Sequence, residues 1–157
     1  LNISFRELGG VAPDAFEGLV YHLPGACLEV VFGLPYPCSC AQRAVEAAGG
    51  AFRRIEVINS RLSERGLPGI TIGAGIATGF VRAGLVSNDK SVNGLVIAGV
   101  RELAAECQRA AGAGQTIVCP TTASELEGKF NFEDTGRDVS EVGESGDTVI
   151  RRLFTLA

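Results

Sequence analysis

Strand and helix patterns marked by glycines alternate through the middle of the chain, and this alternation constrains the fold most. Ile70–Gly84 predicts a strand with a break at Thr78-Gly79, because glycine inside a strand marks a bend or a close backbone approach. A helix is predicted over Gly99–Ala111, and a strand over Gln115–Cys119. Alternation of this kind is typical of helices packed on one mixed sheet.

The rest of the chain continues the alternation. Cys40–Arg65 has the apolar periodicity of a helix, with Ser39 before it and Gly66 after it. Gly49-Gly50 inside that helix predicts a bend or a close packing contact. The other predicted elements are strands at Leu1–Phe5, Phe16–Leu23, Cys27–Phe32, Gly94–Ile97, Phe130–Glu133 and Val149–Leu156, a short helix at Thr121–Leu126, a hairpin turn at Pro24-Gly25, a polar turn at Ser87–Asn93, and a loop at Gly136–Asp147.

Length and composition limit the class of protein. The 157 residues suffice for one domain with a real core, and no internal repeat or linker is visible. The formal charge of −4 comes without a basic stripe, which argues against nucleic-acid binding. No apolar run reaches membrane-spanning length, so no membrane contact is expected. The 46% hydrophobic content predicts a well-filled core and a buried partner face.

The metal-binding residue types are sparse. The chain has five cysteines, an odd number, whose spacing forms neither a zinc ribbon nor a CxxC pair, and one histidine, His22. Reduced thiols in a cytoplasmic protein are therefore expected, with no structural metal site. The cysteines are Cys27, Cys38, Cys40, Cys107 and Cys119.

Three segments together resemble a known family. They are VVFGLP from Val30, ITIGAGIATGFVRAG from Ile70, and VIAGVRELAAECQRAAGAGQTIVCP from Val96. They are similar to the class III adenylate/guanylate cyclase homology domain, whose second half reads roughly GIHTGxVxxG, VxGdxVNxAARL and pGxIxvS. The resemblance implies an α+β fold with a ferredoxin-like βαββαβ core: a mixed, mostly antiparallel sheet with helices packed on it. It also implies head-to-tail dimers with sites at the interface.

The chemistry of that family needs particular side chains. Two carboxylates hold two Mg²⁺ or Mn²⁺ ions that activate the ribose hydroxyl and bind the triphosphate. An asparagine orients the ribose, an arginine stabilises charge on the phosphates, and a lysine and an aspartate read the purine. By this resemblance, each role can be assigned to a position of the chain.

The two metal-binding positions are poorly matched. The GDG turn that carries the second carboxylate corresponds to Gly25-Ala26-Cys27, and Ala26 has no group that binds a metal. The first carboxylate corresponds to Glu7. Too few residues separate Glu7 from Ala26, as if about two helices were missing, so the domain over residues 1–157 is expected to be abbreviated at its N-terminus. The alternative is that Glu7 is a solvated charge near a terminus.

The helix motif aligns without a gap and departs at three positions. Gly99 stands at the purine-reading aspartate, Glu102 at the ribose-orienting asparagine and Glu106 at the phosphate-stabilising arginine. A carboxylate at Glu106 would repel a phosphate charge about 4 Å away by about 4 kcal/mol at an effective dielectric near 20. Alternatively, Glu102 and Glu106 hold a cation or a cationic partner, or they form a solvated face with Arg101 and Arg109 nearby.

The sequence therefore predicts a degenerate cyclase homology domain, a pseudoenzyme. It would act as a dimerisation or regulatory signalling module, as a homodimer or with another cyclase-like domain, and would need no cofactor. Two other functions stay open. One is a cyclase that works with unorthodox residues or with a partner chain; the other is a small-molecule sensor that uses the vestigial pocket.

Overall fold

The computed structural model of the protein describes residues 18–22, 27–34, 39–88, 91–142 and 148–157. The chain divides into two compact units. The first contains the described residues up to Ala74 together with Ala111–Thr116, and the second contains Gly75–Ala110 and Ile117–Ala157. The prediction of one single domain is not tested by this division.

The first unit begins with the predicted hairpin. Strands β1 (Leu19–His22) and β2 (Leu28–Val31) are antiparallel, with Leu19 opposite Val31 and His22 opposite Leu28. The predicted turn at Pro24-Gly25 lies outside the described residues, as does the predicted strand Leu1–Phe5.

Helix α2 (Cys40–Ser63) confirms the long helix predicted from apolar periodicity. It ends where Leu67 N–H donates to the Leu62 carbonyl and Gly66 N–H donates to the Ser63 carbonyl, both at 2.9 Å. With Gly66 at a φ of 66°, this is a Schellman motif. Among the described residues, a methyl group at Gly49 would meet only the end of the Arg53 side chain, at 3.5 Å, so Gly49 shows no close packing contact there. The alternative prediction of a bend at Gly49-Gly50 stays a prediction.

A small apolar cluster holds α2 against the segment that follows it. Ile55 and Ile58 are buried and pack against Leu62, Ile70 and Ile72, among others. Asn59 adds a polar clamp nearby: its Nδ2 donates to the Ile70 carbonyl at 2.9 Å, and its Oδ1 accepts from Ile70 N–H at 2.7 Å. Both backbone groups of Ile70 are thus satisfied by one side chain.

A four-stranded sheet in the order β3-β6-β8-β7 lies mostly in the second unit. Its strands are β3 (Ala74–Ile76), β6 (Thr116–Val118), β7 (Phe132–Val142) and β8 (Thr148–Leu156). Ala74 N–H donates to the Gln115 carbonyl and Cys119 N–H to the Ile76 carbonyl, so β3 and β6 run parallel. Since β8 is antiparallel to both β6 and β7, the sheet is mixed, as predicted.

Two helices pack within the second unit. Helix α3 (Arg101–Ala110) contacts β5 and β7, and helix α4 (Pro120–Glu125) contacts β8. Cys119 precedes α4 in an extended conformation, and Pro120 occupies the first turn, where its missing N–H costs nothing. The predicted α+β class with helices packed on a mixed sheet is confirmed.

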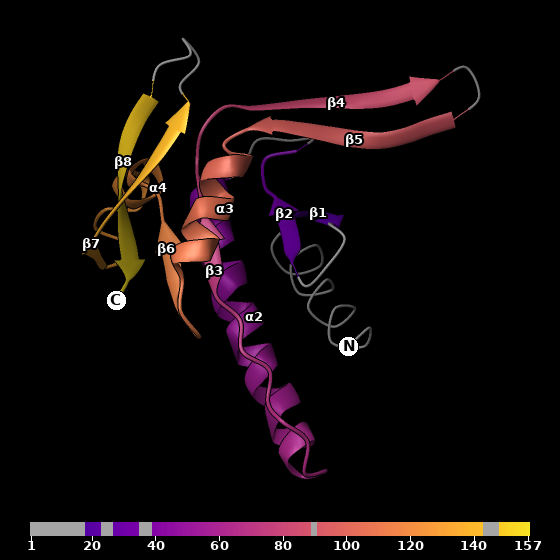
Figure 1. The fold of residues 1–157 in the computed structure, drawn as a ribbon, viewed down its shortest axis with the longest axis vertical. Helices are drawn as coiled ribbons and strands as arrows, with labels where there is room; N and C mark the ends of the chain where they lie inside the picture. Colours follow the sequence, from indigo (N-terminus) through magenta and orange to yellow (C-terminus); the bar gives the residue numbers. More distant parts are fainter. Residues whose placement is uncertain (1–17, 23–26, 35–38, 89–90, 143–147) are drawn as a thin grey trace. The chain divides into compact units, whose positions relative to one another are not determined.

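Two predicted loops are largely wrong. Strands β4 (Val81–Asn88) and β5 (Ser91–Gly99) form a long antiparallel hairpin (Figure 1), so most of the predicted turn at Ser87–Asn93 is strand. Likewise, β7 runs through much of the predicted loop Gly136–Asp147. Polar composition suggested a loop in both places, but hydrogen bonds to a neighbouring strand depend on the backbone and not on side-chain polarity.

Candidate functional site

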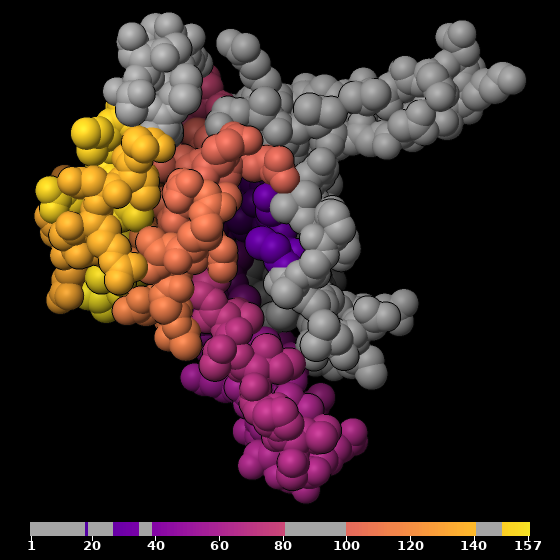
Figure 2. Space-filling model, in the orientation of Figure 1, coloured from indigo at the N-terminus to yellow at the C-terminus, as the bar shows by residue number. Residues whose placement is uncertain are grey.

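Helix α3 has an inner and an outer face. At 100° per residue, Leu103 and Cys107 fall on one side, and they are 5% and 0% exposed. Glu102, Ala105 and Arg109 fall on the opposite side, with Glu106 at its edge, and we call these four residues the outer face of α3. Glu102 and Arg109 are exposed, and α3 is seen on the visible surface in Figure 2 as the orange-red atoms near the middle. Glu102 therefore lies on the side of α3 away from Leu103 and Cys107, and Glu106 lies half-exposed at the edge of that side.

The outer face contains an ion pair within the helix. Arg109 Nη2 lies 2.5 Å from Glu106 Oε1, and Arg109 Nε donates to Glu106 Oε2 at 3.4 Å. The hydrogen bond to Glu106 raises the pKa of the Arg109 guanidinium above its usual value; desolvation lowers it, and the Coulombic attraction of Glu106 adds to the rise. The side chains are 61% exposed for Arg109 and 41% for Glu106, so water screens the pair.

Glu102 differs from Glu106 because it has no partner among the described residues. It lies in the first turn of α3, where a carboxylate favours the positive end of the helix dipole. The two glutamates therefore do not act as a matched pair: Glu106 is neutralised by Arg109, while Glu102 keeps a free charge.

The inner face of α3 rests directly on strand β3. A methyl group at Gly75 would lie 2.1 Å from the Gln108 nitrogen and 2.4 Å from the Ala104 carbonyl oxygen. A methyl group at Gly79 would lie 2.4 Å from Val100 Cγ1. Gly75 thus permits close packing of the β3 and α3 backbones, and Gly79 leaves room for the Val100 side chain. Both are the structural role that the sequence favoured over a phosphate-binding loop.

A buried polar cluster, missed in the sequence, joins the end of β3 to the start of α4. Thr78 Oγ1 and Thr122 Oγ1 are 2.8 Å apart, and Cys119 Sγ lies 3.3 Å from Thr122 Oγ1. Cys119 and Thr122 are fully buried, so the Thr122 hydroxyl needs such a partner. The only hint in the sequence is the run Cys-Pro-Thr-Thr at a predicted helix start.

A bulge in β7 contacts the C-terminal end of α3. The sequence patterns did not predict this bulge. Between Asp134 and Asp138 the pairing with β8 shifts, and Gly136 there has a φ of 69°. Within the bulge, Thr135 Oγ1 accepts from Arg137 N–H at 3.1 Å. Arg137 Nη1 then donates to the carbonyl of Ala110, the last residue of α3, at 2.8 Å. Arginine at this position satisfies one of the open carbonyls of a helix C-terminus.

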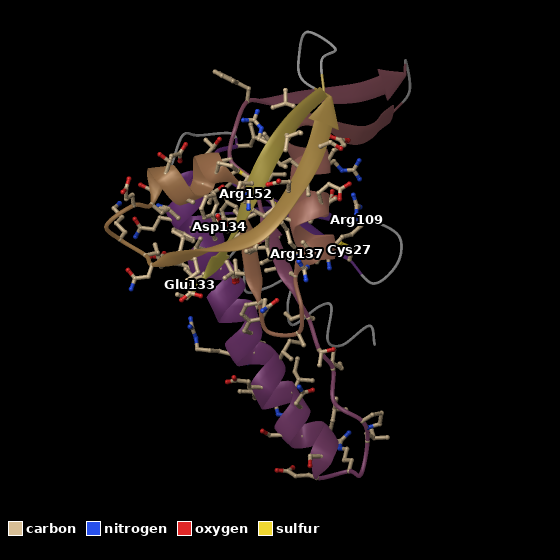
Figure 3. The ribbon with its side chains drawn as sticks, turned by 60° about the vertical axis from the view of Figure 1, so that its left-hand side comes forward. Cys27, Arg109, Glu133, Asp134, Arg137 and Arg152 are labelled. Atoms are coloured by element: carbon tan, nitrogen blue, oxygen red, sulfur yellow. The ribbon has the colours of Figure 1, made fainter. Side chains whose placement is uncertain are left out.

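Charges on β7 and β8 hold the two ends of this bulge together. Arg152 Nε lies 2.7 Å from Asp138 Oδ1, and Arg152 Nη1 lies 3.6 Å from Asp134 Oδ1. Figure 3 shows Arg152 and Asp134 close together on β8 and β7. Asp134 Oδ1 also accepts from Gly136 N–H at 2.7 Å. Because these carboxylates are already engaged, they are not obvious ligands for a metal.

The described residues contain no group of three or more histidine, cysteine or acidic side chains arranged to hold a metal ion. Within the same residues, no helix is long and apolar enough to cross a membrane.

Comparison with solved structures identifies the fold. The guanylyl cyclase Cya2 matches over 100% of this chain and 78% of its own, with 21% identity and a TM-score of 0.82. The adenylyl cyclase CyaB from P. aeruginosa matches over 99% of this chain and 79% of its own, with 20% identity and a TM-score of 0.81. The fold is that of a nucleotide cyclase domain.

A third structure with the cyclase fold concerns assembly. It is a dimeric guanylyl cyclase domain of the RhoGC fusion protein from the aquatic fungus Blastocladiella emersonii, which matches over 99% of this chain and 79% of its own, with 18% identity and a TM-score of 0.72. The same domain also has a monomeric crystal structure. No protein-family model matches the sequence, and no curated protein matches it.

The predicted positions of the cyclase motifs can now be located. Glu102 and Glu106 lie one turn apart on the outer face of α3, and Gly99 is the last residue of β5, opposite Val81. Glu7 and Ala26 lie outside the described residues. The structure thus places Glu102 and Glu106, which the resemblance assigns to the ribose and phosphate positions, on one helix. Those roles, and both predicted metal positions, stay predictions.

Proposed function

We propose that this chain is a catalytically inactive nucleotide cyclase domain that acts as a dimerisation and regulatory signalling module. The observation that carries the proposal is the state of Glu106. This residue stands where the resemblance calls for a phosphate-stabilising arginine, and it carries the opposite charge. Its ion pair with Arg109 occupies Nε and Nη2 of the nearest cationic group on the outer face of α3.

The other positions support the same conclusion. Glu102 offers acceptors but no donor when ionised, whereas an asparagine amide both donates and accepts. Gly99 has no side chain to read a purine. Ala26 has no oxygen or nitrogen ligand, and the proposed module needs no Mg²⁺ or Mn²⁺.

The proposed module pairs with itself or with another cyclase-like domain. The dimeric structure of the RhoGC domain supports this, and its monomeric structure indicates that such domains also exist unpaired. A specific pair should bury about 1,200–2,000 Å² in total. Sedimentation of the purified chain at high concentration tests this part of the proposal.

An assay for cyclic AMP and cyclic GMP, with ATP or GTP and Mn²⁺, tests the lack of catalysis. Removal of one charge-stabilising donor costs about 10²–10³ in rate, so the loss of several should leave no product above a buffer blank. Product formation that depends on the metal and scales with protein would show an active cyclase. Product that appears only with an added cyclase domain would favour the alternative of an enzyme pair.

A further inference from the structure

The outer face of α3 carries both signs of charge, arranged along one stripe. Glu102 and Arg109 are seven residues apart, which is two helical turns, about 10.5 Å along the axis and within about 20° around it. Ala105 lies between them and has a short side chain. Glu102 has no partner among the described residues, while Arg109 is bound to Glu106 through Nε and Nη2. The Nη1 group of Arg109 therefore remains for a second carboxylate.

This arrangement is complementary to itself. When two copies meet about a two-fold axis, the same surface faces itself, and residue i of one copy meets residue j of the other while j meets i. Two antiparallel α3 helices that cross between Ala105 and Glu106 bring Glu102 of each copy opposite Arg109 of the other. The short side chain of Ala105 lets the helices approach to the usual 8–10 Å or so.

We propose that the outer face of α3 is a two-fold contact with a second copy of this chain, in which Glu102 of each copy pairs with Arg109 of the other. Each Arg109 then bridges Glu106 of its own helix and Glu102 of its partner. The inference rests on the proposed pairing function and adds the surface and the residues that make it specific.

The charge pattern favours a second copy of this chain over other binding partners. An anionic ligand such as a triphosphate meets the unpaired Glu102, and a strongly cationic partner meets Arg109. A second copy supplies one charge of each sign at matching positions, so no like charges face each other. Like charges that face each other across an interface weaken binding. The Glu102–Arg109 pairs therefore determine which partner binds more than they determine the affinity.

Two opposite charge reversals test the contact. In Glu102→Arg, two cationic residues face each other twice across the axis, and in Arg109→Glu two anionic residues do so. Each variant alone should dimerise at least about tenfold more weakly than the parent in sedimentation at low salt. An equimolar mixture of the two variants should recover pairing, because every facing pair then has opposite signs. The double variant Glu102→Arg/Arg109→Glu should also pair with itself.

A matched control separates this contact from a general effect of charge. Glu133 is an exposed glutamate on β7 in the same unit, and Glu133→Arg should pair like the parent. Glu102→Arg leaves the Glu106–Arg109 ion pair in place, so its fold is expected to survive, and thermal unfolding by circular dichroism checks this for each variant. The recovery on mixing does not depend on either variant being as stable as the parent.

The outcomes distinguish the inference from the function it rests on. If the parent pairs and both single variants pair equally well, or if mixing them gives no recovery, the α3 contact is wrong and the proposed module stands. If the parent stays monomeric at high concentration, the pairing function fails and this contact fails with it. Recovery only on mixing supports the contact.

Discussion

The two faces of α3 lie on one ten-residue helix but are constrained in different ways. The inner face presses its backbone on Gly75 and buries Leu103 and Cys107. The outer face carries Glu102 and the Glu106–Arg109 pair in water. Shape decides which residues fit the inner face, whereas charge and chemistry decide what the outer face can do. The residues that fix the fold of α3 and the residues that decide its surface chemistry can therefore change independently.

The largest effect is expected on the inner face. Gly75→Ala places a methyl group 2.1 Å from the Gln108 nitrogen, so strand β3 and helix α3 must separate. Overpacking of this kind costs about 1–3 kcal/mol, measured as the loss in the free energy of unfolding in urea. Gly49→Ala is the matched control, because a methyl group there has room and removes a helix glycine, which should stabilise by about 0.5–1 kcal/mol. Equal changes in the free energy of unfolding for Gly75→Ala and Gly49→Ala would contradict the claim that, of these two glycines, only Gly75 lacks room for a methyl group.

A smaller effect is expected at the C-terminal end of α3. Arg137→Ala removes the donor to the Ala110 carbonyl, and a partly exposed hydrogen bond contributes about 0.5–1.5 kcal/mol. Hydrogen exchange should show faster opening of the last turn of α3 than of its first turn. Arg65→Ala, an exposed arginine just after α2, is the control and should leave α3 unchanged. Unchanged exchange in α3 for Arg137→Ala would mean that the bulge in β7 does not anchor the helix.

The smallest effect is expected on the outer face. Glu106→Gln removes the charge that binds Arg109, but the pair is screened by water. For the monomeric chain, the urea concentration at the midpoint of unfolding should shift by less than the error of the fit. A clear loss of stability would show that the outer face is a structural element, and the contrast between the two faces of α3 would then be weaker than described.

The sequence predicts the elements better than the connections between them. The periodicity of α2 and the glycines around α3 led to the right helices, because apolar spacing reports directly on a buried face. The extents of the β4–β5 hairpin and of β7 were missed, because strand pairing depends on a neighbour distant in sequence. For the same reason, nothing local announced that Arg137 would reach Ala110, or that Thr78 would meet Thr122.

The site shows the same division. The gapless helix motif located Glu102 and Glu106 on one helix face, and the structure agrees. The sequence left open whether the two carboxylates act together, and the structure separates them, since Arg109 binds Glu106 and leaves Glu102 free. Arg109 was named only as a nearby charge, because spacing does not tell which of several neighbouring partners a flexible side chain chooses.

Titration of the purified chain with ATP and with GTP, in the presence of Mn²⁺, tests most directly the claim that the outer face of α3 is no longer a nucleotide site. Calorimetry should be done at concentrations where the chain is monomeric and again where it is fully paired, so that both an open outer face of α3 and a site between two copies are tested. No saturable binding at micromolar affinity is expected for either nucleotide. Saturable binding of ATP or GTP at micromolar affinity would contradict the claim.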